Sequence, residues 1–238
     1  PIIEPLGEVA HYAPTSATTS VWEDCSGLDN HAVNDGAELL KPQLQETYTT
    51  NQELVSSLSG RGGGYSFHEA AADINISSHP AYTPYHSVLV DFDFTADGAT
   101  QYIYMKYSGS NSRFYIYLNA NDELVVGKWD SSTVIAPISV GRHRVIVTRD
   151  TTEQKVYIDG KLVSSESPST FGSANAASLE LGNQSGSGPF SGHLYEVRDF
   201  NRALTAAEVE LVSRGQSLGY ADVGASGSAD YTQDTSAT

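Results

Sequence analysis

The sequence predicts an all-β protein, a sandwich or barrel of short antiparallel strands with one helix near its C-terminal end. Apolar and polar residues alternate with period two through several segments from residue 87 onward, which is typical of half-buried strands. Turn-forming residues separate these segments at short intervals. Charged residues make up only 18% of the 238 residues, which disfavours helix bundles and coiled coils. The length allows one large all-β domain or two small ones.

The alternation between residues 88 and 126 divides the side chains between two faces. We expect the apolar face to form the core, and it consists of Val88, Val90, Phe92, Phe94, Ile103, Met105, Phe114, Ile116, Leu118, Leu124 and Val126. The opposite face then carries two aspartates and four tyrosines: Asp91, Asp93, Tyr102, Tyr104, Tyr115 and Tyr117.

Later strands follow the same pattern. They are predicted at residues 123–129, 144–149, 155–158, 161–163, 178–181 and 193–200. Asp159-Gly160 lies between two apolar strands, and this dipeptide favours a type I′ hairpin turn because both positions take positive φ.

One helix is signalled by its ends. Thr205 and Glu208 form a capping box, and Leu204 and Val209 supply a hydrophobic staple. We expect Arg214-Gly215 to end the helix, with the arginine in the last turn, where a cation complements the helix dipole.

The composition divides the chain into three parts. Residues 1–20 form a lead-in that contributes an edge strand, and residues 21–215 form the domain. Residues 216–238 are rich in Ser, Gly, Ala, Thr and Asp, and we expect a linker or an extended arm there. The chain has one methionine, Met105, and none at its start, which indicates a segment cut from a longer polypeptide.

The charge excludes two classes of partner. Thirteen Lys and Arg against 29 Asp and Glu give a net charge of −16, which argues against binding nucleic acid or docking on anionic lipid. No apolar run approaches the length of a membrane span. The single cysteine, Cys25, forms no internal disulfide and leaves the compartment open.

Three segments carry a family resemblance. Trp22–Ala32 (WEDCSGLDNHA), the hairpin VYIDGKLV and Phe190–Val209 occur in an order and spacing that resemble the laminin-G-like branch of the concanavalin A-like lectin/glucanase superfamily. The resemblance covers roughly residues 20–215 and implies a jelly-roll sandwich of two antiparallel sheets. Domains of this kind occur in lectins, in carbohydrate-binding modules of secreted enzymes, and in bacteriophage tail fibres and tailspikes.

The polar face predicts a glycan platform. Aromatic rings stack on the apolar face of a sugar, and carboxylates accept hydrogen bonds from its hydroxyl groups. The platform would comprise Asp91, Asp93, Tyr102, Tyr104, Tyr115, Tyr117 and, at the end of a neighbouring strand, Trp129. The alternatives are an ordinary β-rich surface, or a face covered by the lead-in or by a partner chain.

A hydrolase and a calcium site are also considered. The superfamily that the chain resembles includes glycoside hydrolases, which share the motif Glu-x-Asp-x-(x)-Glu on a strand, but after Asp91 and Asp93 this chain has Thr95 and Ala96. We therefore expect no enzyme, because an acid/base pair lacks its second member. Asp24 and Asn30 offer oxygen ligands to Ca²⁺, with an Asx-turn loop as the favoured alternative.

The expected function is that of a non-catalytic glycan-recognising module. We expect it to bind the bacterial surface as part of a phage tail fibre or tailspike, outside the cell or on the virion. Neutral glycans are easier targets than anionic ones, and a homotrimer is expected by analogy with fibres. The rivals are a structural spacer or trimer-assembly module, and a carbohydrate-binding module or hydrolase of a secreted bacterial enzyme.

Overall fold

A computed structural model of the chain describes thirteen stretches. These are residues 4–5, 8–17, 21–24, 32–35, 38–40, 64–67, 73–79, 85–107, 113–128, 131–167, 177–184, 187–215 and 220–221. Before residue 65 the description is limited to the backbone.

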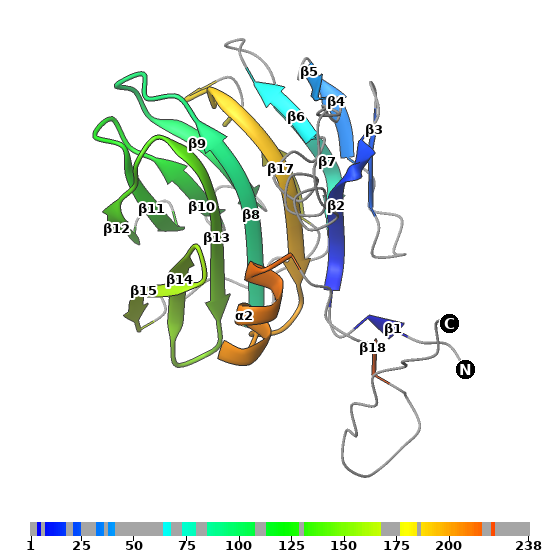
Figure 1. The fold of residues 1–238 in the computed structure, drawn as a ribbon, viewed down its shortest axis with the longest axis vertical. Helices are drawn as coiled ribbons and strands as arrows, with labels where there is room; N and C mark the ends of the chain where they lie inside the picture. The colour runs from blue at the N-terminus through cyan, green and yellow to red at the C-terminus, as the bar shows by residue number, and fades with distance from the viewer. Residues whose placement is uncertain are drawn as a thin grey trace, which may run out of the picture.

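Strands dominate these stretches (Figure 1). The strands are β1 (Glu4–Pro5), β2 (Glu8–Ala17), β3 (Val21–Asp24), β4 (Ala32–Asp35), β5 (Glu38–Leu40), β6 (Gly64–Phe67), β7 (Asp73–His79), β8 (His86–Phe94), β9 (Gln101–Tyr107), β10 (Arg113–Leu118), β11 (Glu123–Lys128), β12 (Ser131–Pro137), β13 (Gly141–Arg149), β14 (Gln154–Ile158), β15 (Lys161–Glu166), β16 (Ala177–Leu181), β17 (Gly192–Phe200) and β18 (Tyr220–Ala221). The helix α2 spans Ala206–Ser213.

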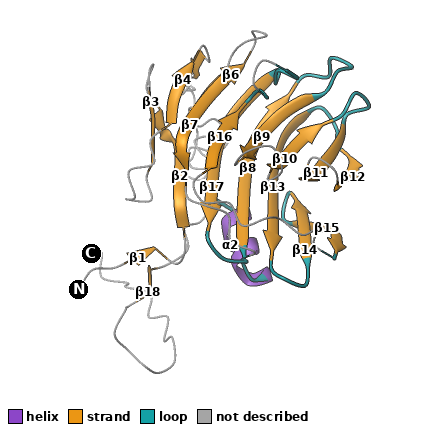
Figure 2. Cartoon of the chain, turned by 180° about the vertical axis from the view of Figure 1, so that it is seen from behind, coloured by secondary structure: helices purple, strands orange, loops and turns teal. Residues whose placement is uncertain are grey.

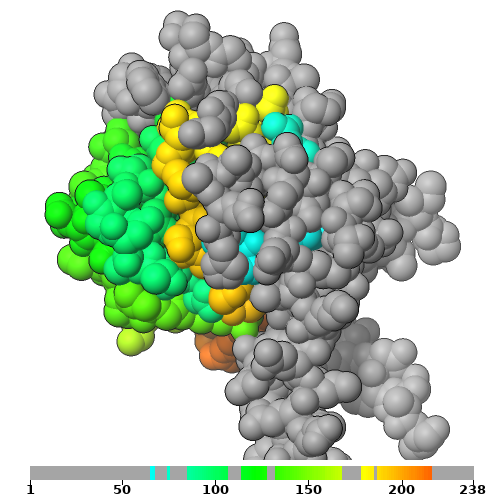
Figure 3. Space-filling view, turned by 90° about the horizontal axis from the view of Figure 1, so that it is seen from above, coloured from blue at the N-terminus to red at the C-terminus, as the bar shows by residue number. Residues whose placement is uncertain are grey.

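The strands form a sandwich of two antiparallel layers, as the sequence predicts. One layer has the order β12-β11-β10-β9-β16-β7, and the other has the order β2-β17-β8-β13-β14-β15. Strands β4 and β3 connect β7 to β2, so hydrogen bonding continues from one layer to the other. In the space-filling view from above, the green segments of residues 85–167 lie against the yellow and orange segments of residues 177–200 (Figure 3).

The core lies between the two layers. Val90 and Phe92 of β8 are fully buried there, together with Ile116 of β10 and Val126 of β11. The predicted apolar face is therefore confirmed for these three strands. Burial of large apolar side chains contributes roughly 1.5–3 kcal/mol each to the stability of the fold.

The local turn and capping predictions are also confirmed. Asp159 and Gly160 both have positive φ, 51° and 77°, as a type I′ turn requires. At the start of α2, the Glu208 amide donates to Thr205 Oγ1 and the Thr205 amide donates to the Glu208 carboxylate. Arg214 is the C-cap rather than a residue of the last turn, which corrects its predicted position.

The helix packs on the outer side of the second layer. Val209 and Val212 of α2 are buried against Leu89, Ile146 and residues beside them. Figure 2 shows the purple helix at one end of strands β17, β8 and β13. The fold thus has a second, smaller apolar cluster outside the sandwich, which fixes α2 beside the polar part of the same sheet face.

The lead-in and the arm each contribute to pairing. Strand β2 lies between β3 and β17, so this part of residues 1–20 is inside the sheet rather than at its edge. Strand β1 pairs with β18, the part of residues 216–238 that the structure describes. The division of the chain into three parts stays a prediction.

Candidate functional site

The predicted glycan platform is divided between two sheets. Strand β8, which carries Asp91 and Asp93, pairs with β13 and β17. Strands β9 and β10, which carry the tyrosines, pair with each other and with β16 and β11 in the other layer. Side chains that point away from the core on different layers point in opposite directions. The prediction of one continuous floor is therefore wrong, because neighbours in sequence belong to different sheets.

Tyr104 is also misplaced by the sequence prediction. The register of β9 against β10 shifts, with Tyr102 opposite Tyr117 but Tyr104 opposite Ile116. Ile103 is thus an additional residue, and such a bulge interrupts strict alternation. Tyr104 consequently points into the core, where it is fully buried.

The remaining tyrosines form a cluster on the outer side of the β9–β10 sheet. The ring centroids of Tyr102 and Tyr117 are 5.1 Å apart, and those of Tyr102 and Tyr115 are 5.5 Å apart. Tyr115 is only 2% exposed, and its hydroxyl accepts a hydrogen bond of 3.4 Å from Gln184. Tyr102 and Tyr117 are half-buried. This cluster lies on the far side of the sandwich from Asp91 and offers less open ring surface than a flat platform.

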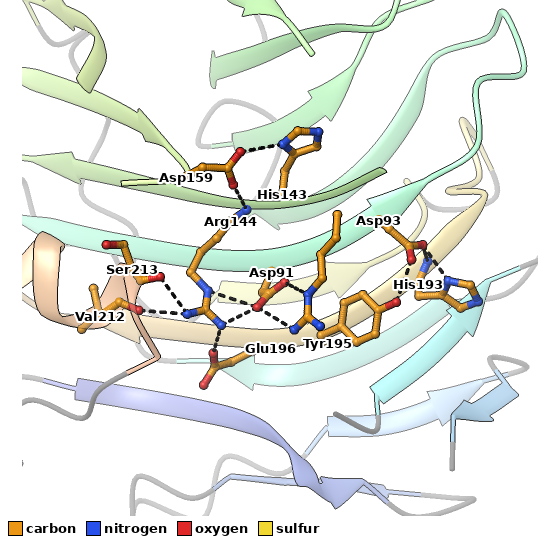
Figure 4. Close-up of polar contacts among 11 residues, drawn as sticks. Asp91, Asp93, His143, Arg144, Asp159, His193, Tyr195, Glu196, Val212 and Ser213 are labelled. Carbon is orange, nitrogen blue, oxygen red and sulfur yellow. Dashed lines mark hydrogen bonds and ion pairs between the residues drawn. The ribbon is translucent and has the colours of Figure 1, made fainter. Parts of the chain in front are cut away.

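Asp91 is the centre of a charged network on the outer side of the β8–β13–β17 sheet (Figure 4). Its carboxylate accepts hydrogen bonds from Arg142 Nε at 2.8 Å and Nη2 at 3.0 Å. Arg144 donates to it through Nε at 3.1 Å and through Nη2. Arg142 and Arg144 flank Asp91 because β13 pairs with β8 so that Arg144 lies directly opposite it. Charge-assisted bonds of this kind are the strong ones in proteins.

Arg144 extends the network to α2. Its Nη1 donates to the carbonyl oxygens of Val212 and Ser213 at 3.2 and 3.1 Å, and its Nη2 contacts Glu196 at 3.1 Å. The last carbonyl groups of a helix have no partner inside the helix. Arg144 therefore satisfies the C-terminal end of α2 and holds it against the sheet.

Asp93 has a different set of partners. One oxygen is 2.6 Å from His193 Nδ1, and the other accepts the Tyr195 hydroxyl at 2.7 Å. The Arg142 guanidinium lies 3.9 Å from the centroid of the Tyr195 ring, a cation–π contact. Burial, and then the hydrogen bond to Asp93, raise the pKa of the Tyr195 hydroxyl above its usual value. Tyr195 therefore stays a neutral donor and connects Asp93 to Arg142.

A cavity of about 310 Å³ opens beside this network. It lies between β13, the Asp159-Gly160 turn and the end of α2, and is lined by Asp91, Arg142, His143, Arg144, Asp159, Ser213 and Arg214. The turn places Asp159 so that one carboxylate oxygen accepts the Arg144 amide at 2.9 Å. The structure thus has a shallow, open depression lined by charged side chains on the face opposite the tyrosine cluster.

His143 and Asp159, which both line the cavity, lie next to each other (Figure 4). His143 Nδ1 lies 2.9 Å from Asp159 Oδ2, and Nε2 lies 2.8 Å from the carbonyl oxygen of Ser139. Ser139 Oγ also lies 3.4 Å from Nε2, so both ring nitrogens of His143 have polar partners.

The arginines and aspartates that line the cavity all have partners. Asp91 is paired with Arg142 and Arg144, Asp159 Oδ2 lies 2.9 Å from His143 Nδ1, and Arg214 pairs with Glu210 at 2.5 Å. An incoming ligand meets hydrogen-bond donors and acceptors of both kinds. Such a lining can hydrogen-bond a polar, uncharged molecule from several sides.

The side chains of three predicted site residues lie outside what the structure describes. Trp129 and Asn30 are not among the described residues, and Asp24 is described by its backbone only, in β3. The calcium prediction at Asp24 and Asn30 therefore stays a prediction. Within the described ranges, no three His, Cys, Asp or Glu side chains gather as a metal site requires.

The sequence prediction missed the arginines. Residues 144–149 were expected as the strand, whereas β13 begins at Gly141. Arg142, Arg144 and Ile146 are each two residues apart, so their side chains lie on the same face of the strand. This spacing is the signal in the sequence that could have found the arginines. The two arginines face Asp91 because strands about fifty residues apart in the sequence pair with each other. The alternation within one strand does not reveal such pairing.

The sequence and fold identify the family of the chain. A sequence profile of the concanavalin A-like lectin/glucanases superfamily matches residues 70–210, more than half of the chain. The chain belongs to this superfamily, and its fold is of the laminin-G-like type. No curated protein matches it by sequence. Among the described residues, no helix has the length and apolarity needed to cross a membrane.

The solved structures with a similar fold include a sialidase and a domain of an arabinanase. Trypanosoma rangeli sialidase, in complex with the inhibitor DANA, aligns with a TM-score of 0.64 and 13% identity over 89% of this chain. This chain spans about a third (33%) of the sialidase chain. Domain 4 of AbnA, an extracellular arabinanase from Geobacillus stearothermophilus in complex with arabinotriose, aligns with a TM-score of 0.56 and 18% identity, over 87% of this chain and 98% of that domain.

Proposed function

We propose that this chain is a non-catalytic carbohydrate-recognising module. The observation that carries the proposal is the cavity of about 310 Å³, lined by arginine and aspartate side chains, on the outer face of a lectin-type sandwich. Small-molecule sites usually occupy about 300–1,000 Å³, so the cavity has room for one or two sugar rings. The similar domain 4 of AbnA was solved with arabinotriose, which supports a sugar as the ligand class.

The cavity favours a neutral sugar. Arg142 and Arg214 can donate to ring and hydroxyl oxygens, and Asp159 can accept from hydroxyl groups. Planar side chains with two parallel donors or acceptors suit the adjacent hydroxyls of a sugar. A polyanionic glycan would be repelled by the net charge of −16.

The partners of Asp91 support binding rather than hydrolysis. Its carboxylate is 2% exposed and is held by two guanidinium groups. A general acid must pick up and release a proton at the substrate, whereas both carboxylate oxygens of Asp91 already accept hydrogen bonds from the two guanidinium groups. The rival proposal, a glycoside hydrolase, predicts release of reducing ends from polysaccharide.

The family and the composition also support a proposal for the wider setting. We place the module outside the cell or on a virion, as the host-surface-binding part of a phage tail fibre or tailspike that assembles as a homotrimer. Several weak sugar sites on one trimer would then bind a surface together. The rivals are a spacer or trimer-assembly module of a fibre, and a carbohydrate-binding module of a secreted bacterial hydrolase. The molecular mass in solution, measured with and without residues 216–238, tests the assembly.

A glycan array, run with and without a calcium chelator, tests recognition. The matched variants are Arg214→Ala and Asp159→Asn in the cavity, and Tyr117→Ala on the opposite sheet. Asparagine tolerates the positive φ of residue 159, so the turn is kept. We expect each cavity variant to bind the best glycan about tenfold more weakly, as loss of a hydrogen bond to a charged group implies. Tyr117→Ala should bind as the wild type does.

Two other outcomes would contradict a sugar site in the cavity. Loss of binding in Tyr117→Ala, with both cavity variants unaffected, would place the site on the tyrosine cluster. A wild-type protein that retains no glycan, with or without calcium, would remove the proposed function and favour the spacer.

A further inference from the structure

A lysine and an aspartate face each other inside the sandwich. Lys106 comes from β9 and Asp199 from β17, so the two side chains approach from opposite layers. Lys106 Nζ lies 3.7 Å from Asp199 Oδ2, and the side chains are 3% and 4% exposed. Tyr104 Oη donates to the same carboxyl group, at 3.0 Å from Oδ1 and 2.8 Å from Oδ2. Neither the cavity nor the tyrosine cluster uses these three groups.

The cross-strand neighbours of the pair are apolar. Lys106 lies opposite Phe114 on one side and Leu179 on the other, and Asp199 lies opposite Val88. All three neighbours are fully buried in the core. Separated charges are costly in such a medium. Burial lowers the pKa of the Lys106 amine, although the Asp199 charge opposes this. Transfer of one proton from Nζ to the carboxylate leaves an uncharged amine next to an uncharged carboxylic acid.

We propose that Lys106 and Asp199 condense to an intramolecular amide bond that joins the two sheets. The lone pair of Nζ attacks Cγ of the protonated carboxyl group, and the Nζ–Cγ bond forms. The Cγ–O bond to the hydroxyl group breaks, and one Nζ proton passes to that hydroxyl, which leaves as water. Atoms and charge balance without an oxidant, a reductant or a co-reactant.

Tyr104 acts on the reacting carboxyl group. Negative charge develops on the oxygen that stays on Cγ when the tetrahedral intermediate forms. A hydroxyl already aimed at that oxygen stabilises the charge without reorganisation, as oxyanion-hole donors do. The strands supply the second contribution, because β9 and β17 hold the two groups near one another and remove the entropy cost of bringing them together.

The surface offers a matched comparison. Lys155 Nζ is closer to its partner, 2.6 Å from Glu153 Oε2, but these side chains are 35% and 38% exposed. Hydrogen bonding to Glu153 raises the pKa of the Lys155 amine, so the amine stays protonated and is not a nucleophile. A short distance between Nζ and the carboxylate oxygen therefore does not by itself make a lysine–carboxylate pair reactive. The pair must also be buried.

Intact-mass spectrometry of the denatured full chain tests the proposal. We expect the folded protein to be lighter than its sequence by one water molecule. Trypsin does not cleave after an amidated lysine, so residues 62–113 should stay together and carry the peptide Asp199–Arg202. Protein kept in denaturant from the start should show the full mass, since the unfolded chain does not hold the groups together.

Variants identify the reacting groups. Lys106→Met and Asp199→Ala should each have the full mass of their sequence, Tyr104→Phe should form the link more slowly, and Lys155→Met should form it as the wild type does. The wild-type measurement is decisive even where a core variant does not fold. Folded wild-type protein with the full sequence mass, and with cleavage after Lys106, would overturn the proposal.

Discussion

Replacement of Asp91 by alanine should destabilise the protein by about 3 kcal/mol. The Asp91 carboxylate accepts four hydrogen bonds, two from each of Arg142 and Arg144. Removal of one partner from a buried ion pair costs about 3–5 kcal/mol, because the other charge is left without compensation. Here the arginine side chains are 28% and 18% exposed, so water replaces part of what is lost. In the variant, Arg144 still has its hydrogen bonds to Glu196 and to the carbonyl groups of α2. The expected loss of stability therefore lies at the lower end of the 3–5 kcal/mol range.

Equilibrium unfolding in urea, followed by circular dichroism, measures this difference. For a chain of this size, a loss of about 3 kcal/mol corresponds to a Tm lower by about 6–12 °C. The matched control is Asp93→Ala in the same strand. Its side chain is 28% exposed and pairs with His193, which is 31% exposed, so about 1 kcal/mol is expected. If Asp91→Ala costs no more than Asp93→Ala, the two-arginine network does not stabilise the fold as argued.

Two further predictions concern α2 and a tight turn. The hydrogen bond from Arg202, and then the hydrogen bonds from Thr205, lower the pKa of Glu208 from its usual 4.5 to about 2. Because the pKa is lower in the folded state, the ionised Glu208 stabilises the fold above about pH 4.5, and this contribution is lost as the pH falls toward about 2. The protection factors of the α2 amides, which are exchange rates corrected for the intrinsic effect of pH, should therefore fall over that interval in the wild type and show no such fall in Glu208→Gln; equal profiles would contradict the capping role. Gly182→Ala and Gly98→Ala both place a side chain at positive φ, 84° and 72°, but only at residue 182 would the new Cβ overlap the buried Phe67 ring. Each substitution should lower the free energy of unfolding by about 1 kcal/mol or more, and the same urea assay should find the larger decrease at residue 182. Equal decreases would show that the Phe67 ring moves aside freely.

The features that the sequence predicts well are local ones, such as turns and helix caps. The Asp159-Gly160 turn depends on the φ angles of adjacent residues, and the capping box depends on Thr205 and Glu208, three residues apart. Both follow from interactions that short peptides already contain. The jelly-roll architecture follows from a resemblance spread over most of the chain, and the two layers confirm it.

What the sequence does not predict is which strands become neighbours. Period-two alternation assigns each side chain to the core or to the opposite side, but it does not say in which sheet a strand lies. Asp91 and Tyr115 were therefore joined in one surface although β8 and β10 belong to different layers. A single bulge residue, Ile103, moved Tyr104 from the outer face to the core.

The same separation of faces gives two aspartates opposite chemistry. Asp91 lies outside the sandwich core against two guanidinium groups, and a guanidinium does not give up its proton in proteins. Asp199 lies between the layers against an amine, which can transfer a proton to a carboxylate when both are removed from water. Asp91 is thus suited to hold Arg142 and Arg144 in place beside the cavity. Asp199 is suited to lose its charge together with Lys106, and a neutral carboxyl group beside a neutral amine is the pair from which an amide forms. Which aspartate binds and which reacts is decided by the partner that the opposite strand supplies.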